Sequence, residues 1–249
     1  MHHGLKNDTY YATILIIVHL FTKDIWEYTE FMCWNFLFKQ KELDITHLYL
    51  NGRTTRFYFG WKKPYPKIKT VKRIIEMTDY YMKKYPRVEL LLVGDGLSTE
   101  IIEKEYGLLE RNMDGKRVTP QDENIKALHT FLDNPMRSII VFNTYKLEKM
   151  CNWNFFSGGF KSDRNMNIKD VVCKDYVQYI FIHEFAHAID TCYQLCDNTE
   201  LKQLYEKVQG EYKNVKEFIA EAYTVSEICT GNTLANDVRK IIDKIVASN

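Results

Sequence analysis

The sequence predicts an α+β fold, with strands and helices mixed in the first part of the chain and helices alone in the last part. Short apolar runs bounded by turn residues predict strands before Lys169, whereas apolar residues at helical spacing predict helices after it. The 249 residues are 45% hydrophobic and 14% aromatic. This composition is sufficient for one domain core of ordinary size and excludes a disordered chain.

An apolar run at residues 11–21, YATILIIVHLF, predicts a buried strand. A secretory signal segment is the alternative interpretation. Asp8 lies where such a segment has basic residues, His19 interrupts the run, and Thr22 follows where a small-residue cleavage site is expected. The run is also shorter than the about 20 apolar residues that a transmembrane helix needs.

The cysteine content bears on the cellular compartment. Six cysteines in 249 residues are too few for a disulfide scaffold and are typical of free thiols in a reducing compartment. Cys192 and Cys196 are four residues apart, but the sequence has no second close pair to complete a structural zinc site. We therefore expect a cytoplasmic location from the sequence, with secretion as the alternative.

Two prolines in the segment 62–67 mark the predicted boundary between a strand-rich extension, residues 1–61, and a larger domain, residues 68–249. Within the extension, Asn51-Gly52 predicts the tight turn of a β-hairpin, because both residues accept positive φ angles. The elements expected in the domain are a helix from Thr70 to just before Pro86, strands at 88–93 and 137–142, and helices near 172–194, 199–208, 215–228 and 235–247.

The run His183-Glu-Phe-Ala-His187 carries the clearest chemical signal in the chain. Its histidines are about 40° apart around a helix, so both imidazoles leave one face and can bind one metal ion. Glu184 lies about 100° from His183, near enough to act on a water at the metal without binding the metal. Two core histidines bonded to backbone carbonyls are the alternative. Burying two imidazoles and a carboxylate is costly unless a partner such as zinc balances them.

A second run, Glu217-Phe-Ile-Ala-Glu221, lies on a later predicted helix. Catalytic zinc sites use three protein ligands and leave one position open, so a third ligand is expected after His187. One carboxylate of this pair can bind zinc while the other accepts the N–H of a ligating histidine and fixes its tautomer. A solvated acidic stripe is the alternative interpretation.

The runs His183-Glu-Phe-Ala-His-Ala-Ile-Asp190 and Glu217-Phe-Ile-Ala-Glu-Ala-Tyr223 resemble those of the anthrax lethal factor family of gluzincins, which includes clostridial Pro-Pro endopeptidases. The resemblance covers residues 68–249, and between the two runs only the pattern of elements matches. It implies a zincin-like fold, in which a small mixed sheet and an active-site helix precede a helical part.

The resemblance also implies the roles of individual residues. The zinc ligands would be His183, His187 and Glu217. Glu221 would support a ligand from outside the coordination sphere, and Asp190 would be either such a supporting residue or a structural one.

One position departs from the family pattern. The family carries a tyrosine shortly before the ligand glutamate to stabilise the oxyanion, and the corresponding position here is Gly210. We expect Tyr212 to take this role, because Tyr205 lies a turn or more further upstream. The alternative is that Tyr212 is a surface aromatic.

The implied function is that of a zinc metalloendopeptidase, which could be a toxin or effector-like protease. Zn²⁺ would lower the pKa of a water toward about 7, and Glu184 would take its proton as the water attacks the peptide carbonyl. Zn²⁺ and Tyr212 would stabilise the oxyanion. We expect a monomer that acts on a peptide or protein. The net charge of +1 gives no reason to expect nucleic acid or a membrane as partner.

Zincins hold an extended substrate along an edge strand beside the active-site helix. The residues expected to form this strand are Ile139, Ile140, Val141 and Phe142. Residues 156–160 are expected to form either a rim over the cleft or an ordinary turn. His129 and His47 have no neighbouring partner in the sequence and are expected to be structural.

Two other functions fit the same residues: a zincin-like binding module without activity, and a metal hydrolase acting on a small amide. The presence of Glu184 and of all three expected ligands argues against an inactive module. The missing tyrosine at Gly210 is the main observation in its favour.

Overall fold

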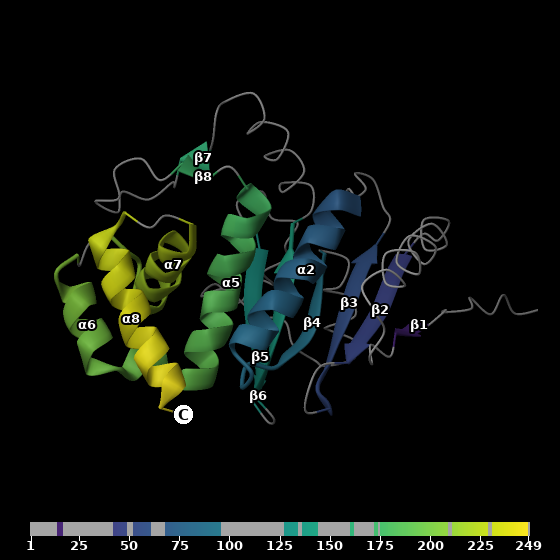
Figure 1. Cartoon of the computed structure of the whole chain (residues 1–249), viewed down its shortest axis with the longest axis horizontal. Coiled ribbons are helices and arrows are strands. Elements are labelled where there is room, and N and C mark those ends of the chain that lie inside the picture. The colour runs from purple at the N-terminus through teal and green to yellow at the C-terminus, as the bar shows by residue number, and fades with distance from the viewer. Residues whose placement is uncertain are drawn as a thin grey trace, which may run out of the picture.

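The computed structural model contains a mixed β-sheet (Figure 1). Helices lie in front of the sheet, and a further group of helices lies beside it. The structure describes residues 14–16, 42–48, 52–60, 68–95, 127–133, 136–143, 160–161, 172–173, 175–208, 211–228 and 231–248. The predicted combination of a small mixed sheet with a helical C-terminal part is confirmed.

The main sheet has the strand order β1-β2-β3-β4-β6-β5. Its strands are β1 (Ile14–Ile16), β2 (Glu42–Leu48), β3 (Thr54–Gly60), β4 (Leu90–Asp95), β5 (Ala127–Asp133) and β6 (Met136–Phe142). β3, β4 and β6 are parallel, and β5 pairs antiparallel with β6. Two short strands, β7 (Phe160–Lys161) and β8 (Val172–Cys173), form a separate antiparallel pair.

The structure describes five α-helices, and capping residues mark the ends of several of them. They are α2 (Ile68–Lys84), α5 (Tyr176–Tyr193), α6 (Thr199–Glu206), α7 (Val215–Ile228) and α8 (Thr233–Ala247), with a 3-10 turn, η3 (Leu195–Asp197), after α5. Asp175 caps α5 by accepting a hydrogen bond from the Gln178 backbone N–H at 3.0 Å. α5 ends at Gln194, whose φ of 53° lies in the left-handed region.

Aromatic residues fix α5 against the sheet. Phe142 of β6 stacks on Phe181 of α5 with ring centroids 6.4 Å apart, and Phe181 stacks on Phe185 at 5.9 Å. Tyr81 of α2 contacts both phenylalanines of α5. These fully or nearly fully buried rings supply much of the apolar area that holds the two helices and the sheet together.

The predicted boundary at residues 62–67 does not divide the sheet. β3 lies before this segment and α2 and β4 follow it, yet β3 pairs in parallel with β4. A parallel pair joined through a helix is a β-α-β crossover, which belongs to a single sheet. Phe57 and Phe59 of β3 share one core with α5. The expected separation of residues 1–61 from the larger domain is therefore wrong for the described strands.

Most element boundaries lie close to the predicted ones. The hairpin of β2 and β3 is confirmed, but its last pair is Leu48 with Thr54, so the loop is longer than a two-residue turn. Gly52 in this loop has a φ of 71°, which suits glycine. Thr70 lies inside α2 rather than at its cap, because the helix begins at Ile68. Residues 156–159 of the expected rim lie outside the described residues.

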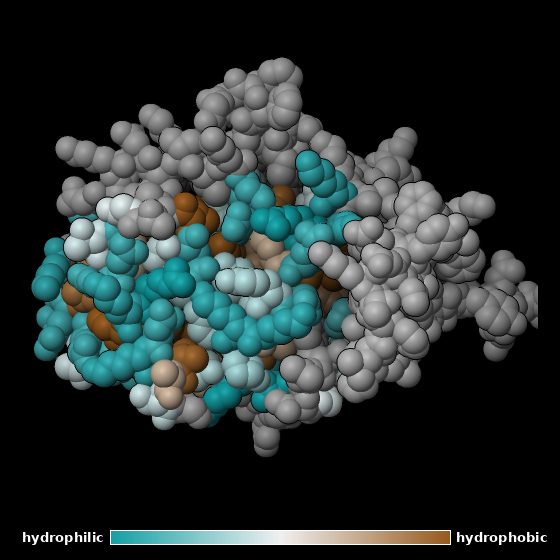
Figure 2. Space-filling view, viewed as in Figure 1, coloured by the Kyte–Doolittle hydropathy of each residue, from teal (hydrophilic) through white to brown (hydrophobic). Residues whose placement is uncertain are grey.

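The helices turn polar side chains outward. On the face shown in Figure 2, hydrophilic residues cover most of the described surface over α2 and α8. In the described part of the chain, none of the helices combines the length and the apolar character that a membrane crossing requires.

Candidate metal centre

Two helices bring the predicted site residues together. α5 carries His183 and His187 four residues apart, and α7, which packs against α5, carries Glu217 and Glu221 with the same spacing. Residues at this spacing lie on one helix face. The two motifs, widely separated in the sequence, therefore face each other across one helix–helix contact.

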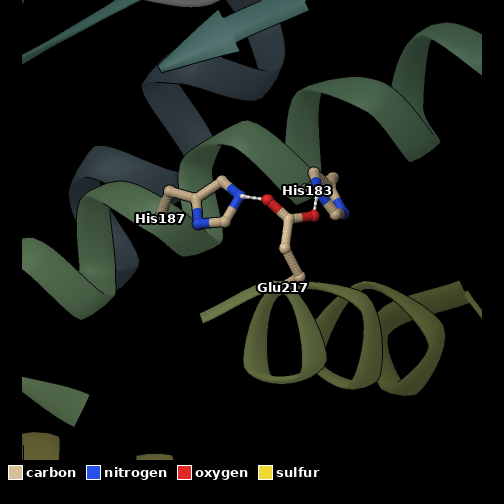
Figure 3. A group of neighbouring side chains, drawn as sticks. All are labelled: His183, His187 and Glu217. Carbon is tan, nitrogen blue, oxygen red and sulfur yellow. Dashed lines mark ion pairs between the residues drawn. The ribbon is translucent and has the colours of Figure 1, made fainter. Parts of the chain in front are cut away.

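The three predicted metal ligands form a compact group. One ligand atom from each of His183, His187 and Glu217 lies within 4.8 Å of the others. The Nε2 atom of His183 is 3.6 Å from Oε2 of Glu217, and the Nε2 atom of His187 is 3.6 Å from Oε1 of the same carboxylate. Figure 3 shows the histidines pointing from α5 toward Glu217 of α7.

This group fits a zinc ion in donor type and spacing. Zinc takes imidazole nitrogen and carboxylate oxygen at about 2.0–2.2 Å in a tetrahedron, which places neighbouring ligand atoms about 3.3–3.5 Å apart. Each histidine nitrogen lies 3.6 Å from one oxygen of Glu217, which is close to that value, but the two distances run to different oxygens of the carboxylate. Three protein ligands also match the composition of catalytic zinc sites, which keep one position open.

Glu221 lies behind His183. Its Oε2 atom is 3.4 Å from Nδ1 of His183, while Nε2 of the same imidazole faces Glu217. A carboxylate beside Nδ1 favours a proton on that nitrogen and leaves Nε2 available for a metal. Glu221 thus lies where it could orient His183, and its supporting role stays a prediction.

Tyr179 extends this row of contacts. Its hydroxyl donates a hydrogen bond of 2.5 Å to Oε1 of Glu221. Tyr179 precedes His183 by four residues on α5, so it lies on the same helix face as the two histidines. Both oxygens of Glu221 are therefore directed at groups on α5.

The carboxylates control the charge of His183 in the metal-free protein. Burial alone would lower the pKa of this imidazole, but the adjacent carboxylates of Glu217 and Glu221, together with the charge of Glu184, raise the pKa to about 10. The site thus favours a positive charge at the position where the histidine nitrogens and carboxylate oxygens converge.

Glu184 is buried on α5 beside the first histidine. Its charge contributes to the raised pKa of His183, which places the two groups in electrostatic contact. A general base must come within hydrogen-bond reach of the proton that it accepts, so the role of Glu184 stays a prediction.

His129 is a site neighbour that the sequence did not indicate. It lies on β5, and its ring stacks on that of His187 with centroids 6.0 Å apart and an interplanar angle of 27°. Its Nε2 atom is 2.9 Å from Oγ of Ser138 on β6. Burial and the neighbouring His187 and Lys216 lower the pKa of His129 to about 3, so the imidazole is neutral.

Tyr212 lies just before α7 and is not a surface aromatic. Its side chain is buried, and its ring packs edge-on against Phe218 with centroids 5.4 Å apart. Phe218 follows Glu217 directly, so Tyr212 packs beside the first turn of the helix that carries the expected third ligand. Its role toward an oxyanion stays a prediction.

Asp190 stabilises the end of α5. Its Oδ1 atom accepts a hydrogen bond of 2.6 Å from the backbone N–H of Cys196. This bond fastens the 3-10 turn η3 to the last turns of α5, which is a structural role. Burial raises the pKa of this carboxyl group.

The expected substrate strand is not at the sheet edge. Ile139, Ile140, Val141 and Phe142 belong to β6, which pairs with β4 on one side and β5 on the other. Their backbone groups face both neighbouring strands, and their side chains are buried in the two cores that flank the sheet. The expected edge position is therefore wrong, because β5 covers β6. At this end of the main sheet β5 is the edge strand, and its His129 contacts His187.

The structure is that of a mixed α/β protein in which a His-His-Glu group that could hold a metal ion lies between two helices. No family model matches the chain, and searches of curated proteins and of solved structures also found no match.

Proposed function

We propose that the protein is a zinc-dependent metalloendopeptidase with a zincin-like fold, related to the anthrax lethal factor family. The observation that carries the proposal is the convergence of His183, His187 and Glu217, whose ligand atoms come within 4.8 Å of one another. Two runs that resemble the family in sequence supply these three residues from separate helices. Both the spacing and the donor types are those of catalytic zinc sites.

His183, His187 and Glu217 would hold the ion, which when bound supplies a Lewis acid and lowers the pKa of water. Glu221 orients His183 through its contact with Nδ1. Glu184 accepts the proton from the attacking water and returns it to the leaving amine, a role that its burial beside His183 supports.

The substrate would be an extended peptide that lies along β5. In the part of the chain that the structure describes, β5 pairs with β6 on one side only, and its His129 contacts His187. An extended chain added to this edge would pass beside the ligand group. Backbone hydrogen bonds to β5 would provide affinity, and nearby side chains would provide sequence preference.

The test is the cleavage of a peptide library by the wild-type chain and by a Glu184→Gln variant, both loaded with zinc. We expect the variant to retain about one zinc per chain and to lose cleavage of every peptide. If both proteins bind zinc and neither cleaves any peptide, the inactive binding module replaces the peptidase. If neither binds zinc, the metal centre itself is wrong.

A further inference from the structure

The contacts between α5 and α7 form one continuous row with Tyr179 at its end. Along α5 the participants are Tyr179, His183 and His187, and along α7 they are Glu221 and Glu217. Each glutamate has its two oxygens directed at two different α5 residues. The order of contacts is His187, Glu217, His183, Glu221 and Tyr179.

Within this row, the bond from Tyr179 is the shortest. The hydroxyl of Tyr179 is 2.5 Å from Oε1 of Glu221, whereas Oε2 is 3.4 Å from Nδ1 of His183. The Glu221 side chain is 2% exposed, so its position depends on protein donors rather than on bulk water. A hydrogen bond to one carboxylate oxygen fixes the direction in which the other oxygen points.

We infer that Tyr179 is a positioning residue for the metal centre, acting on His183 through Glu221. By holding Oε1, Tyr179 keeps Oε2 directed at Nδ1 of His183 and thereby keeps Nε2 directed at the metal position. This inference rests on the proposed zinc site, but it concerns a residue outside the ligand set and outside both sequence motifs.

The test is the zinc affinity of the Tyr179→Phe variant, measured by competition with a chelator of known affinity. This substitution removes the hydroxyl and keeps the ring. Removing a partner directly bonded to a ligand weakens metal binding by about 10–100-fold. Because Tyr179 acts one step further away, we expect a loss of about threefold to tenfold, with a changed visible spectrum when cobalt replaces zinc.

Tyr85→Phe is the matched control. Tyr85 is also buried, and its hydroxyl lies 2.6 Å from that of Tyr223 on α7. This control removes the same chemical group and a contact with the same helix, but away from Glu221. Denaturant unfolding of the zinc-free proteins will show the stability that each substitution costs. We expect both variants to lose stability and only Tyr179→Phe to lose zinc affinity.

A second background tests whether the effect passes through Glu221. In a chain that carries Glu221→Ala, Tyr179 has no carboxylate to position, so Tyr179→Phe should have no further effect on zinc affinity. A further loss in that background would overturn the assignment.

The remaining outcomes are also decisive. Unchanged zinc affinity in Tyr179→Phe overturns the inference while leaving the proposed peptidase intact. Equal losses in Tyr179→Phe and Tyr85→Phe overturn it as well, because they indicate a general loosening of α7. If the wild-type chain binds no zinc, the proposed function falls and this inference falls with it.

Discussion

Helix α7 carries two carboxylate clusters of different kinds. Near its C-terminal end, Glu227 is bonded to Lys84 of α2 at 2.6 Å and to Arg239 of α8 at 3.1 Å, and accepts a hydrogen bond from Tyr81. Near its N-terminal end, the contacts that the structure shows for Glu217 and Glu221 are with histidines and a tyrosine of α5.

The difference lies in where the balancing positive charge comes from. Lysine and arginine are permanently charged at neutral pH, so the cluster around Glu227 is balanced by the chain itself. The contacts shown for Glu217 and Glu221 include histidines, which carry a positive charge only when they take a proton, and the pKa of about 10 for His183 reflects the pull of these carboxylates. The first cluster is suited to joining helices, and the second is suited to a metal.

The largest effect is expected from removing the ligand carboxylate. Glu217→Gln keeps the shape of the side chain and removes its charge, so zinc affinity should fall by more than about 100-fold. The measurement is chelator competition on the purified, folded protein. Zinc binding equal to that of the wild type would exclude Glu217 as a ligand.

The opposite result is expected at the other end of the same helix. Glu227→Gln removes the carboxylate charge that faces Lys84 and Arg239, and the free energy of unfolding should fall by about 2 kcal/mol. Among the described residues, only Arg239 of these two keeps a second carboxylate, Asp243 at 3.5 Å. Zinc affinity of the folded protein should not change. If Glu227→Gln weakened zinc binding as strongly as Glu217→Gln, the two clusters would not be separate.

The pH dependence of stability should differ between the metal-free and zinc-loaded proteins. The folded-state pKa of His183 is raised from 6.5 to about 10, so its contribution is fully present below pH 6.5 and is lost as pH rises toward about 10. Zinc takes the place of the proton and should remove this loss. Denaturant unfolding between pH 6.5 and about 10, with and without chelator, measures this loss of stability in the two forms. In the metal-free protein, His183→Gln should abolish the loss.

The smallest effect is expected at His129. Its pKa is lowered to about 3, so the metal-free protein should lose stability as pH falls from 6.5 toward 3, where the unfolded chain takes up a proton first. His129→Phe keeps a flat ring against His187 and has no proton to gain. The variant should lose less stability than the wild type over this range. An identical loss in both proteins would show that His129 is not held neutral.

The sequence indicated which side chains come together at the candidate site because helix spacing is a local property. Four-residue spacing alone places His183 and His187 on one face, and the same rule applies to Glu217 and Glu221. The contact between Glu221 and His183 was predicted because a histidine that binds a metal through one ring nitrogen needs a partner for the other. Most helices and strands were predicted for the same reason, since apolar periodicity is read within one segment.

The errors concern contacts between distant segments. His129 reaches His187 because β5 folds back beside β6, and no strand was predicted for residues 127–133. The same pairing makes β6 an inner strand. Tyr179 continues the four-residue spacing of the histidines, which is a signal that could have identified it. Among 17 tyrosines, however, a buried hydroxyl donor looks like an ordinary core residue.

X-ray absorption at the zinc edge of the purified protein tests the metal centre most directly. We expect about one zinc per chain, bound by nitrogen and oxygen at about 2.0–2.2 Å, with the signal lost when Glu217→Gln and His183→Gln are combined. Zinc bound by sulfur at about 2.3 Å would place the metal at cysteines such as Cys192 and Cys196 instead. That result, or the absence of zinc, would contradict the account.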